Sequence, residues 1–277
     1  MKLYKVVQGA IVEENGSYYQ LDQVLWDNLV NRDDLYNHLK QAIQGITPEK
    51  SEGDLLKNIE SPIGSQEIWA SGVTYYKSRE ARMEESEDGG DFYDKVYDAE
   101  RPELFFKGNA FRTAHPGGEL FIRKDSKWDV PEPELTLFMT SNAKIVAYTI
   151  GNDMSSRSIE GENPLYLPQA KVYDKCAGLG PCLYVTEKPI PENTSITLEI
   201  FRNNEKAFSE TIGIDQMKRK HTDLVEFLFR ECSFPTGCFL MTGTGIVPPN
   251  EFTLQEGDKV SISIEHIGTL THSIAKK

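Results

Sequence analysis

Short alternating apolar segments are the feature that most restricts what this chain can fold into. From 196 to 200 and from 260 to 264, every second residue is isoleucine, leucine or valine, and polar residues stand between them. Successive side chains of a strand point to opposite faces, so this pattern is typical of half-buried β-strands. Residues 145–150 form a third apolar run, whereas helices are expected only over 74–87 and 222–232 in this part of the chain. The sequence therefore predicts a mainly β fold of the α+β class.

The N-terminal residues are predicted to form a small unit of their own. Predicted strands over 3–12 and 17–21 flank Asn15-Gly16, a strong signal for a hairpin turn. Apolar residues at helical spacing follow over 22–44, and a polar stretch with prolines and glycines comes after them. The alternative to a domain boundary in this stretch is a loop within one domain. We predict a small α/β domain over 1–65 and a catalytic domain over 66–277.

The charge of the chain excludes several classes of partner. Acidic residues outnumber basic ones 43 to 30, and the net charge is -13. Such a surface repels phosphate backbones and anionic lipids, so neither nucleic acid nor a membrane is expected as a partner. No run approaches the roughly 18 apolar residues of a membrane span, and the start lacks the apolar core of a signal peptide. We therefore expect a cytoplasmic protein, in which the four cysteines are structural thiols.

Two glutamates stand two residues apart in the extended segment WDVPEPELTLFM, which covers 128–139. Glu132 and Glu134 should share one face, while the leucines and methionine that follow point to a core. The two prolines beside the glutamates cannot donate ladder hydrogen bonds, which places the start of this strand at an edge or rim. Two carboxylates on one face repel and are best held together by a divalent cation. The alternative is a solvated strand face.

A third carboxylate and a lysine extend this candidate site. Asp153 follows the predicted strand 145–150 at a strand-to-loop junction, where it can either reach a neighbouring strand end or cap a turn. Three carboxylates favour a hard cation, with Mg2+ the first choice and Mn2+ or Ca2+ as substitutes. Neither segment contains histidine or cysteine, so zinc fits poorly. Lys171 lies in a loop rich in proline and aromatics, either as a binder of a substrate anion or as a surface lysine.

The order of these motifs resembles the fumarylacetoacetate hydrolase superfamily, from about residue 68 to the C-terminus. The matching pieces are Glu-x-Glu at 132–134, GNDMSSRS at 151–158, the lysine before V-Y-D at 171, PELFFKG at 102–108, LGPCLYV at 179–185 and MTGTGIVPP at 241–249. The resemblance implies the mixed β-sandwich roll of that family and a homodimer or dimer of dimers. It also implies Mg2+ held by Glu132, Glu134 and Asp153, with Lys171 close by.

Longer strings are similar to a narrower group of that superfamily, the 2-keto-3-deoxy-sugar-acid dehydratases. These strings are SREARMEES, YDAERPELFFK, SKWDVPEPELTL and SRSIEGENPLYLPQAKVYD. They imply a Mg2+-dependent hydro-lyase of oxidative pentose catabolism that forms 2,5-dioxopentanoate from 2-keto-3-deoxy-arabinonate or -xylonate. We expect these two substrate series to differ at C4. Ser78 stands where hydrolases of the superfamily carry a water-activating histidine, which argues against C–C cleavage.

The resemblance also implies roles for individual residues. A 2-keto acid can chelate Mg2+, which would stabilise the enolate formed when C3 loses a proton. Glu103 is the candidate to move this proton or to assist departure of the C4 hydroxyl, and Lys171 either contacts the substrate oxygens or acts as the base. The candidate substrate-binding residues are Ser78, Arg79, Lys107 and Thr244.

Three points stay open in the sequence. The acidic segment 84–101 is either a lid over the site or a solvated loop. An acylpyruvate-type hydrolase or a decarboxylase of the same superfamily would use the same metal site. A catalytically silent binding protein is the third alternative, although the four residues Glu132, Glu134, Asp153 and Lys171 are all present.

Overall fold

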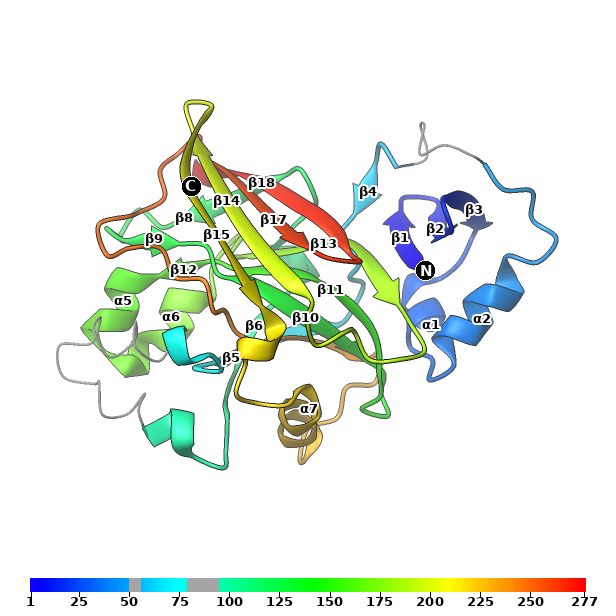
Figure 1. Cartoon of the computed structure of the whole chain (residues 1–277), viewed down its shortest axis with the longest axis horizontal. Helices are drawn as coiled ribbons and strands as arrows, with labels where there is room; N and C mark the ends of the chain where they lie inside the picture. The colour runs from blue at the N-terminus through cyan, green and yellow to red at the C-terminus, as the bar shows by residue number, and fades with distance from the viewer. Residues whose placement is uncertain (50–55, 79–94) are drawn as a thin grey trace.

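A computed structural model describes residues 1–49, 56–78 and 95–277. Within these ranges the chain is mostly β-sheet, which confirms the predicted fold class (Figure 1). Residue Arg79 and residues 84–94 of the predicted lid lie outside the described ranges. The predicted helix over 74–87 is described only as far as Ser78, where residues 76–78 are helical.

A large mixed sheet forms the centre of the molecule. Its strands follow the order β3-β2-β1-β13-β11-β10-β16-β5-β6, with β4 paired to β1 and β7 paired to β13. The bounds are β1 (Lys2–Val6), β2 (Gly9–Glu14), β3 (Ser17–Asp22), β4 (Ile59–Glu60), β5 (Glu67–Gly72), β6 (Glu103–Asn109), β7 (Thr113–Ala114), β10 (Pro133–Met139), β11 (Ile145–Asp153), β13 (Ala177–Val185) and β16 (Cys238–Met241).

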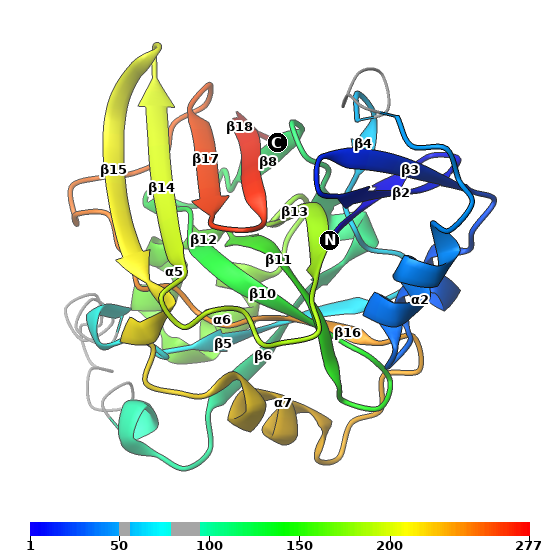
Figure 2. The same ribbon diagram turned by 45° about the vertical axis from the view of Figure 1, so that its right-hand side comes forward.

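A second sheet covers one face of the first, and Figure 2 shows its strands β15, β14, β17 and β18 side by side. It follows the order β15-β14-β17-β18-β8, and a two-stranded ribbon pairs β12 with β9. The bounds are β8 (Glu119–Ile122), β9 (Asp129–Val130), β12 (Ser155–Ser156), β14 (Ser195–Arg202), β15 (Glu205–Gly213), β17 (Lys259–Ile264) and β18 (Gly268–Lys276). The two alternating segments of the sequence are β14 and β17, which pair antiparallel as neighbours.

Helices are short and lie around the sheets. The bounds are α1 (Trp26–Val30), α2 (Leu35–Ala42), α5 (Arg157–Glu162), α6 (Leu167–Lys171) and α7 (His221–Phe229), with 3-10 turns η1 (Ala110–Arg112), η2 (Pro164–Tyr166) and η3 (Ile214–Gln216). The prediction over 222–232 is confirmed by α7. Among the described residues, no helix has the length and apolar character needed to cross a membrane.

Strand β10 contacts two separate cores because both faces of the large sheet are covered. Leu135, Leu137 and Met139 enter the core between the two sheets. Phe138 enters a second core on the opposite face, which α1 and α2 cover. Of the two predicted positions for the start of this strand, the sheet edge is excluded, since β10 lies between β11 and β16. Its first residues nevertheless extend beyond the ladder with β16, which begins at Thr136, so the glutamates lie at the rim of that pair.

The N-terminal residues differ in detail from the prediction. The expected strand over 3–12 is broken into β1 and β2 by a turn at Val7-Gln8, and the expected helix over 22–44 is broken into α1 and α2. Gly9 permits the close approach of β3 to the start of β2, because a Cβ there would lie 2.1 Å from the carbonyl oxygen of Leu21. Strand β1 pairs with β13 of the large sheet. The domain boundary at residue 65 stays a prediction, since this unit shares a sheet with the rest.

Burial of a histidine between the sheets predicts a pH-dependent stability. His272 lies in β18, and burial lowers its pKa from 6.5 to about 4. As the pH falls from 6.5 toward 4, the unfolded chain therefore binds a proton at His272, whereas this histidine stays neutral in the folded chain. The contribution of His272 to stability should be complete above pH 6.5 and should be lost between pH 6.5 and 4, a loss of about 3 kcal/mol from this one group.

Urea unfolding at pH 7.0, 5.5 and 4.5 tests this expectation. The variant His272→Gln should lose less stability than the wild type over this range. The exposed His266 supplies the control, and His266→Asn should retain the pH dependence of the wild type. The same loss in His272→Gln as in the wild type would contradict the prediction.

Candidate metal centre

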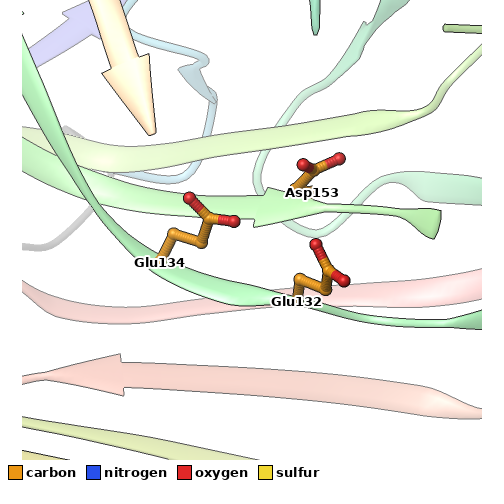
Figure 3. Close-up of side chains that lie close together, drawn as sticks. All are labelled: Glu132, Glu134 and Asp153. Atoms are coloured by element: carbon orange, nitrogen blue, oxygen red, sulfur yellow. The ribbon is translucent and has the colours of Figure 1, made fainter. Parts of the chain in front are cut away.

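The structure brings the three predicted carboxylates together at the ends of two neighbouring strands (Figure 3). Glu132 directly precedes β10, Glu134 lies in β10, and Asp153 is the last residue of β11. One carboxylate oxygen from each lies within 4.8 Å of the other two. The antiparallel register explains this, since the amide of Asp153 donates to the carbonyl oxygen of Glu132 at 2.9 Å. Asp153 thus ends a strand that is longer than predicted.

Three buried carboxylates in one place create an electrostatic problem. Glu134 is 1% exposed, and its pKa is raised well above the ordinary value by burial first and then by the charges of Asp153 and Glu132. The amide of Gly243 donates a hydrogen bond to Glu134 Oε2 at 2.5 Å, and this bond lowers the pKa of Glu134. A divalent cation would relieve the repulsion, and an all-oxygen carboxylate set suits a hard cation. The residues present therefore fit Mg2+.

Two buried lysines provide positive charge at the triad. Lys171 Nζ lies 2.6 Å from Glu132 Oε2 and 3.3 Å from Asp153 Oδ2. Lys107 is fully buried, and its Nζ lies 2.6 Å from Asp153 Oδ1. Lys107 also donates to the carbonyl oxygens of Met154 at 2.8 Å and Lys171 at 2.5 Å. This arrangement favours a role for Lys107 in holding Asp153, and contact with substrate stays a prediction for it.

Two charged residues of the site were missed by the sequence analysis, and both come from α5. Arg157 Nη2 donates to Glu132 Oε1 at 2.8 Å. Glu160 places Oε1 at 3.5 Å from Lys171 Nζ and Oε2 at 3.8 Å from Arg157 Nε. The sequence does contain a charged pair at i and i+3 in SRSIEGE. A helix of six residues is too short for its apolar spacing to show which face is buried, so the pair could not be assigned to the site.

The remaining predicted residues lie in different surroundings. The carboxylate of Glu103 packs against Gly72, where a Cβ would lie 2.1 Å from Glu103 Oε2. The Ser78 hydroxyl donates to the carbonyl oxygen of Tyr75 at 2.8 Å and so braces its own turn. The Thr244 hydroxyl donates to the carbonyl oxygen of Ile246 at 3.2 Å in the loop that also supplies the Gly243 amide. Their roles toward substrate stay predictions.

Comparisons with known proteins point to one family. Residues 99–275 match the family described as fumarylacetoacetate (FAA) hydrolase C-terminal. The chain is 49% identical over 215 residues to a probable 2-keto-3-deoxyxylonate dehydratase of Haloferax volcanii, an alignment that covers 77% of this chain and 73% of that protein. It is 36% identical to the 2-dehydro-3-deoxy-D-arabinonate dehydratase of Saccharolobus solfataricus, and the alignment covers 100% of this chain and 97% of that one.

The structural comparison agrees with the sequence comparisons. A solved structure of 2-keto-3-deoxy-D-arabinonate dehydratase complexed with magnesium and 2,5-dioxopentanoate matches with a TM-score of 0.84 at 34% identity. The match covers 100% of this chain and 99% of that one. The fold is therefore similar along the whole chain, including the N-terminal residues.

Mg2+ should stabilise the folded chain through the triad. A ligand that binds only the folded state at 100 times its Kd adds about 2.7 kcal/mol to the free energy of unfolding. We expect Mg2+ to raise the melting temperature of EDTA-treated protein, and Glu134→Gln to remove most of this increase. Glu162→Gln is the matched control, because Glu162 is exposed on α5. A full Mg2+ response in Glu134→Gln would show that the ion binds elsewhere.

Proposed function

This chain belongs to the fumarylacetoacetate hydrolase family, and on that premise we propose that it is a Mg2+-dependent dehydratase of a 2-keto-3-deoxypentonate. The product would be 2,5-dioxopentanoate, formed by loss of one water. The observation that carries the proposal is the buried triad Glu132, Glu134 and Asp153 with Lys171 in contact with two of its members. Relatives with dehydratase names align over most or all of the chain and support the reaction class.

The charge of the site suits a small anionic substrate. The described cluster contains four carboxylates and three cations, so it carries one net negative charge when all are ionised; its members are Glu132, Glu134, Asp153, Glu160, Lys107, Lys171 and Arg157. Addition of Mg2+ changes this to one net positive charge. A 2-keto acid brings one carboxylate and makes the site neutral, which lowers the cost of burying it.

The residues of this chain divide the work of the dehydration. Bound Mg2+ supplies a Lewis acid for the 2-keto acid and so makes the C3 proton more acidic. Lys171 lies beside the triad, where its ammonium can stabilise negative charge on the keto oxygen or its amine can take the C3 proton. Glu103 is assigned to proton transfer at the departing C4 hydroxyl. The C3=C4 alkene that remains becomes the aldehyde when a proton moves from C5 to C3 and the resulting C4=C5 enol takes a proton at C4. Lys107 and Arg157 hold Asp153 and Glu132 in position.

The stereochemical expectation for the substrate requires correction. We expected the arabinonate and xylonate series to differ at C4, but D-arabinonate and D-xylonate differ only at C2 and C3. Both centres are lost when C2 becomes a ketone and C3 becomes a methylene. The D-arabinonate compound in the name of one relative is therefore the same as the compound derived from D-xylonate, and C4 distinguishes only the D series from the L series.

A dehydratase is favoured over a hydrolase by the residue at position 78. A hydrolytic C–C cleavage needs a base that activates water, and the hydroxyl of Ser78 is bonded to the backbone of Tyr75. All five histidines lie in the described ranges, and none belongs to the described metal-ligand cluster. A homodimer and a cytoplasmic location stay predictions for this enzyme.

Product analysis by NMR tests the proposed function. Protein with Mg2+ is mixed with 2-keto-3-deoxy-D-pentonate and, in a parallel sample, with its C4 epimer; EDTA-treated samples are the controls. We expect an aldehyde signal of 2,5-dioxopentanoate only in the presence of the metal, and the faster epimer identifies the substrate. If both epimers stay intact while an acylpyruvate is cleaved, the assignment to the dehydratases is wrong.

The contact between Glu103 and Gly72 offers a sharp test of the role of Glu103. In Gly72→Ala the new methyl group would occupy the place of the Glu103 carboxylate, which can swing away because it ends a flexible side chain. We expect kcat/KM to fall about 100-fold, the lower end of acid-base contributions, while the melting temperature changes little. Gly108→Ala on β6 is the control, because its Cβ would meet only Arg112 Cβ at 3.5 Å. Full activity of Gly72→Ala would remove Glu103 from the mechanism.

A further inference from the structure

We propose that Glu160 is a positioning residue that takes over the ammonium group of Lys171 when a divalent cation occupies Glu132. The proposal rests on the function proposed above, because it requires the triad to bind Mg2+. It assigns a purpose to a buried carboxylate that lies outside the triad. Glu160 is 3% exposed and contacts both Lys171 and Arg157.

Both carboxylate oxygens of Glu132 contact a cationic side chain. Arg157 Nη2 lies 2.8 Å from Oε1, and Lys171 Nζ lies 2.6 Å from Oε2. A divalent cation and an ammonium group on the same carboxylate oxygen would repel strongly in a site that excludes water. One of the two cations must therefore withdraw from Glu132 when the metal binds there.

Lys171 is better able to withdraw than Arg157. The ammonium is a point charge on a flexible four-carbon stem, whereas the guanidinium is a rigid fork. Arg157 begins α5, and its amide donates to the carbonyl oxygen of Trp128 at 2.8 Å. The side chain of Lys171 has only to turn about its last bonds to exchange one acceptor for another.

The acceptors around Lys171 Nζ decide where the ammonium goes. Ser155 Oγ lies at 2.6 Å but is neutral, and Asp153 Oδ2 at 3.3 Å belongs to the triad and would itself bind the metal. Glu160 Oε1 lies at 3.5 Å and is the one carboxylate in the described surroundings of Lys171 that is not a candidate ligand. A shift of well under 1 Å would bring this pair to the roughly 2.8 Å of a charge-assisted hydrogen bond.

The position of Glu160 is set by its helix. Arg157 and Glu160 are three residues apart on α5 and therefore project from one face. Ser156 is the N-cap, and its hydroxyl accepts from the amide of Ile159 at 3.4 Å. The helix thus presents Arg157 to Glu132 and Glu160 to Lys171 together. After the transfer, Lys171 would stay paired and buried beside the triad while Glu132 keeps Arg157.

Crystal structures of the wild-type chain with and without Mg2+ test the transfer directly. In the metal-free crystal, Lys171 Nζ should be hydrogen-bonded to Glu132 Oε2. In the Mg2+ crystal, the ammonium should be within about 2.8 Å of Glu160 and outside hydrogen-bond distance of Glu132 Oε2. A Mg2+ complex in which Lys171 remains bonded to Glu132 would overturn the proposal.

A double-mutant cycle on Mg2+ affinity tests it without any assay of activity. The Kd of Mg2+ is measured by calorimetry for the wild type, Glu160→Gln, Lys171→Met and the double variant. If Glu160 acts by accepting Lys171, Glu160→Gln should weaken Mg2+ binding about tenfold more when Lys171 is present than when it is methionine. If Glu160 acts only through its charge, Glu160→Gln should weaken Mg2+ binding equally with lysine or methionine at position 171. That result would show that the proposal is wrong.

Controls separate this proposal from the proposed function. Glu162→Gln removes an exposed carboxylate from the same helix and should leave the Kd of Mg2+ near that of the wild type. Absence of Mg2+ binding to the wild type would overturn the metal site and the transfer together. Normal Mg2+ binding with equal losses in the two backgrounds would overturn the transfer alone and leave the proposed function standing.

Discussion

The burial of three carboxylates at one point is the constraint on which the rest of the site depends. Glu132, Glu134 and Asp153 would repel one another strongly away from water, and burial together with the charges of Asp153 and Glu132 raises the pKa of Glu134. The three cations of the cluster partly offset this repulsion. Lys107 and Lys171 contact Asp153, and Arg157 contacts Glu132. With four carboxylates and three cations, the ionised cluster has a net charge of one negative unit, and a divalent ion would change it to one positive unit.

In this fold the three carboxylates lie at strand ends, outside the apolar cores that the strands form. Strand β10 is interior, and its apolar residues fill cores on both faces of the large sheet. The two glutamates lie at the start of the same strand, before the ladder with β16 begins. The pairing with β11 then fixes Asp153 opposite Glu132. The sheet thus positions the candidate ligands, and the short helices α5 and α6 bring Arg157, Glu160 and Lys171 to them.

The proposed chemistry follows from what this cluster lacks as well as from what it contains. The described cluster has acids, lysines and an arginine but no histidine, and position 78 holds a serine committed to its own backbone. Such a set can polarise a 2-keto acid and move protons along its carbon chain. It is less suited to activating water for C–C cleavage. The transfer of Lys171 to Glu160 would let the same lysine neutralise the metal-free site and serve the substrate when metal is bound.

Local patterns in the sequence predicted the β-rich class and the strands β14 and β17, and short motifs together with a family resemblance indicated the candidate ligands Glu132, Glu134 and Asp153. These depend on local alternation and on short motifs, so they can be read from neighbouring residues alone. Three features became evident in the fold alone: β10 is interior, the segment 3–12 turns back at Val7-Gln8, and Arg157 and Glu160 lie at the site. The physical reason is that strand neighbours and buried ion pairs join residues far apart in the chain, and no local pattern specifies which partner a charged side chain will meet.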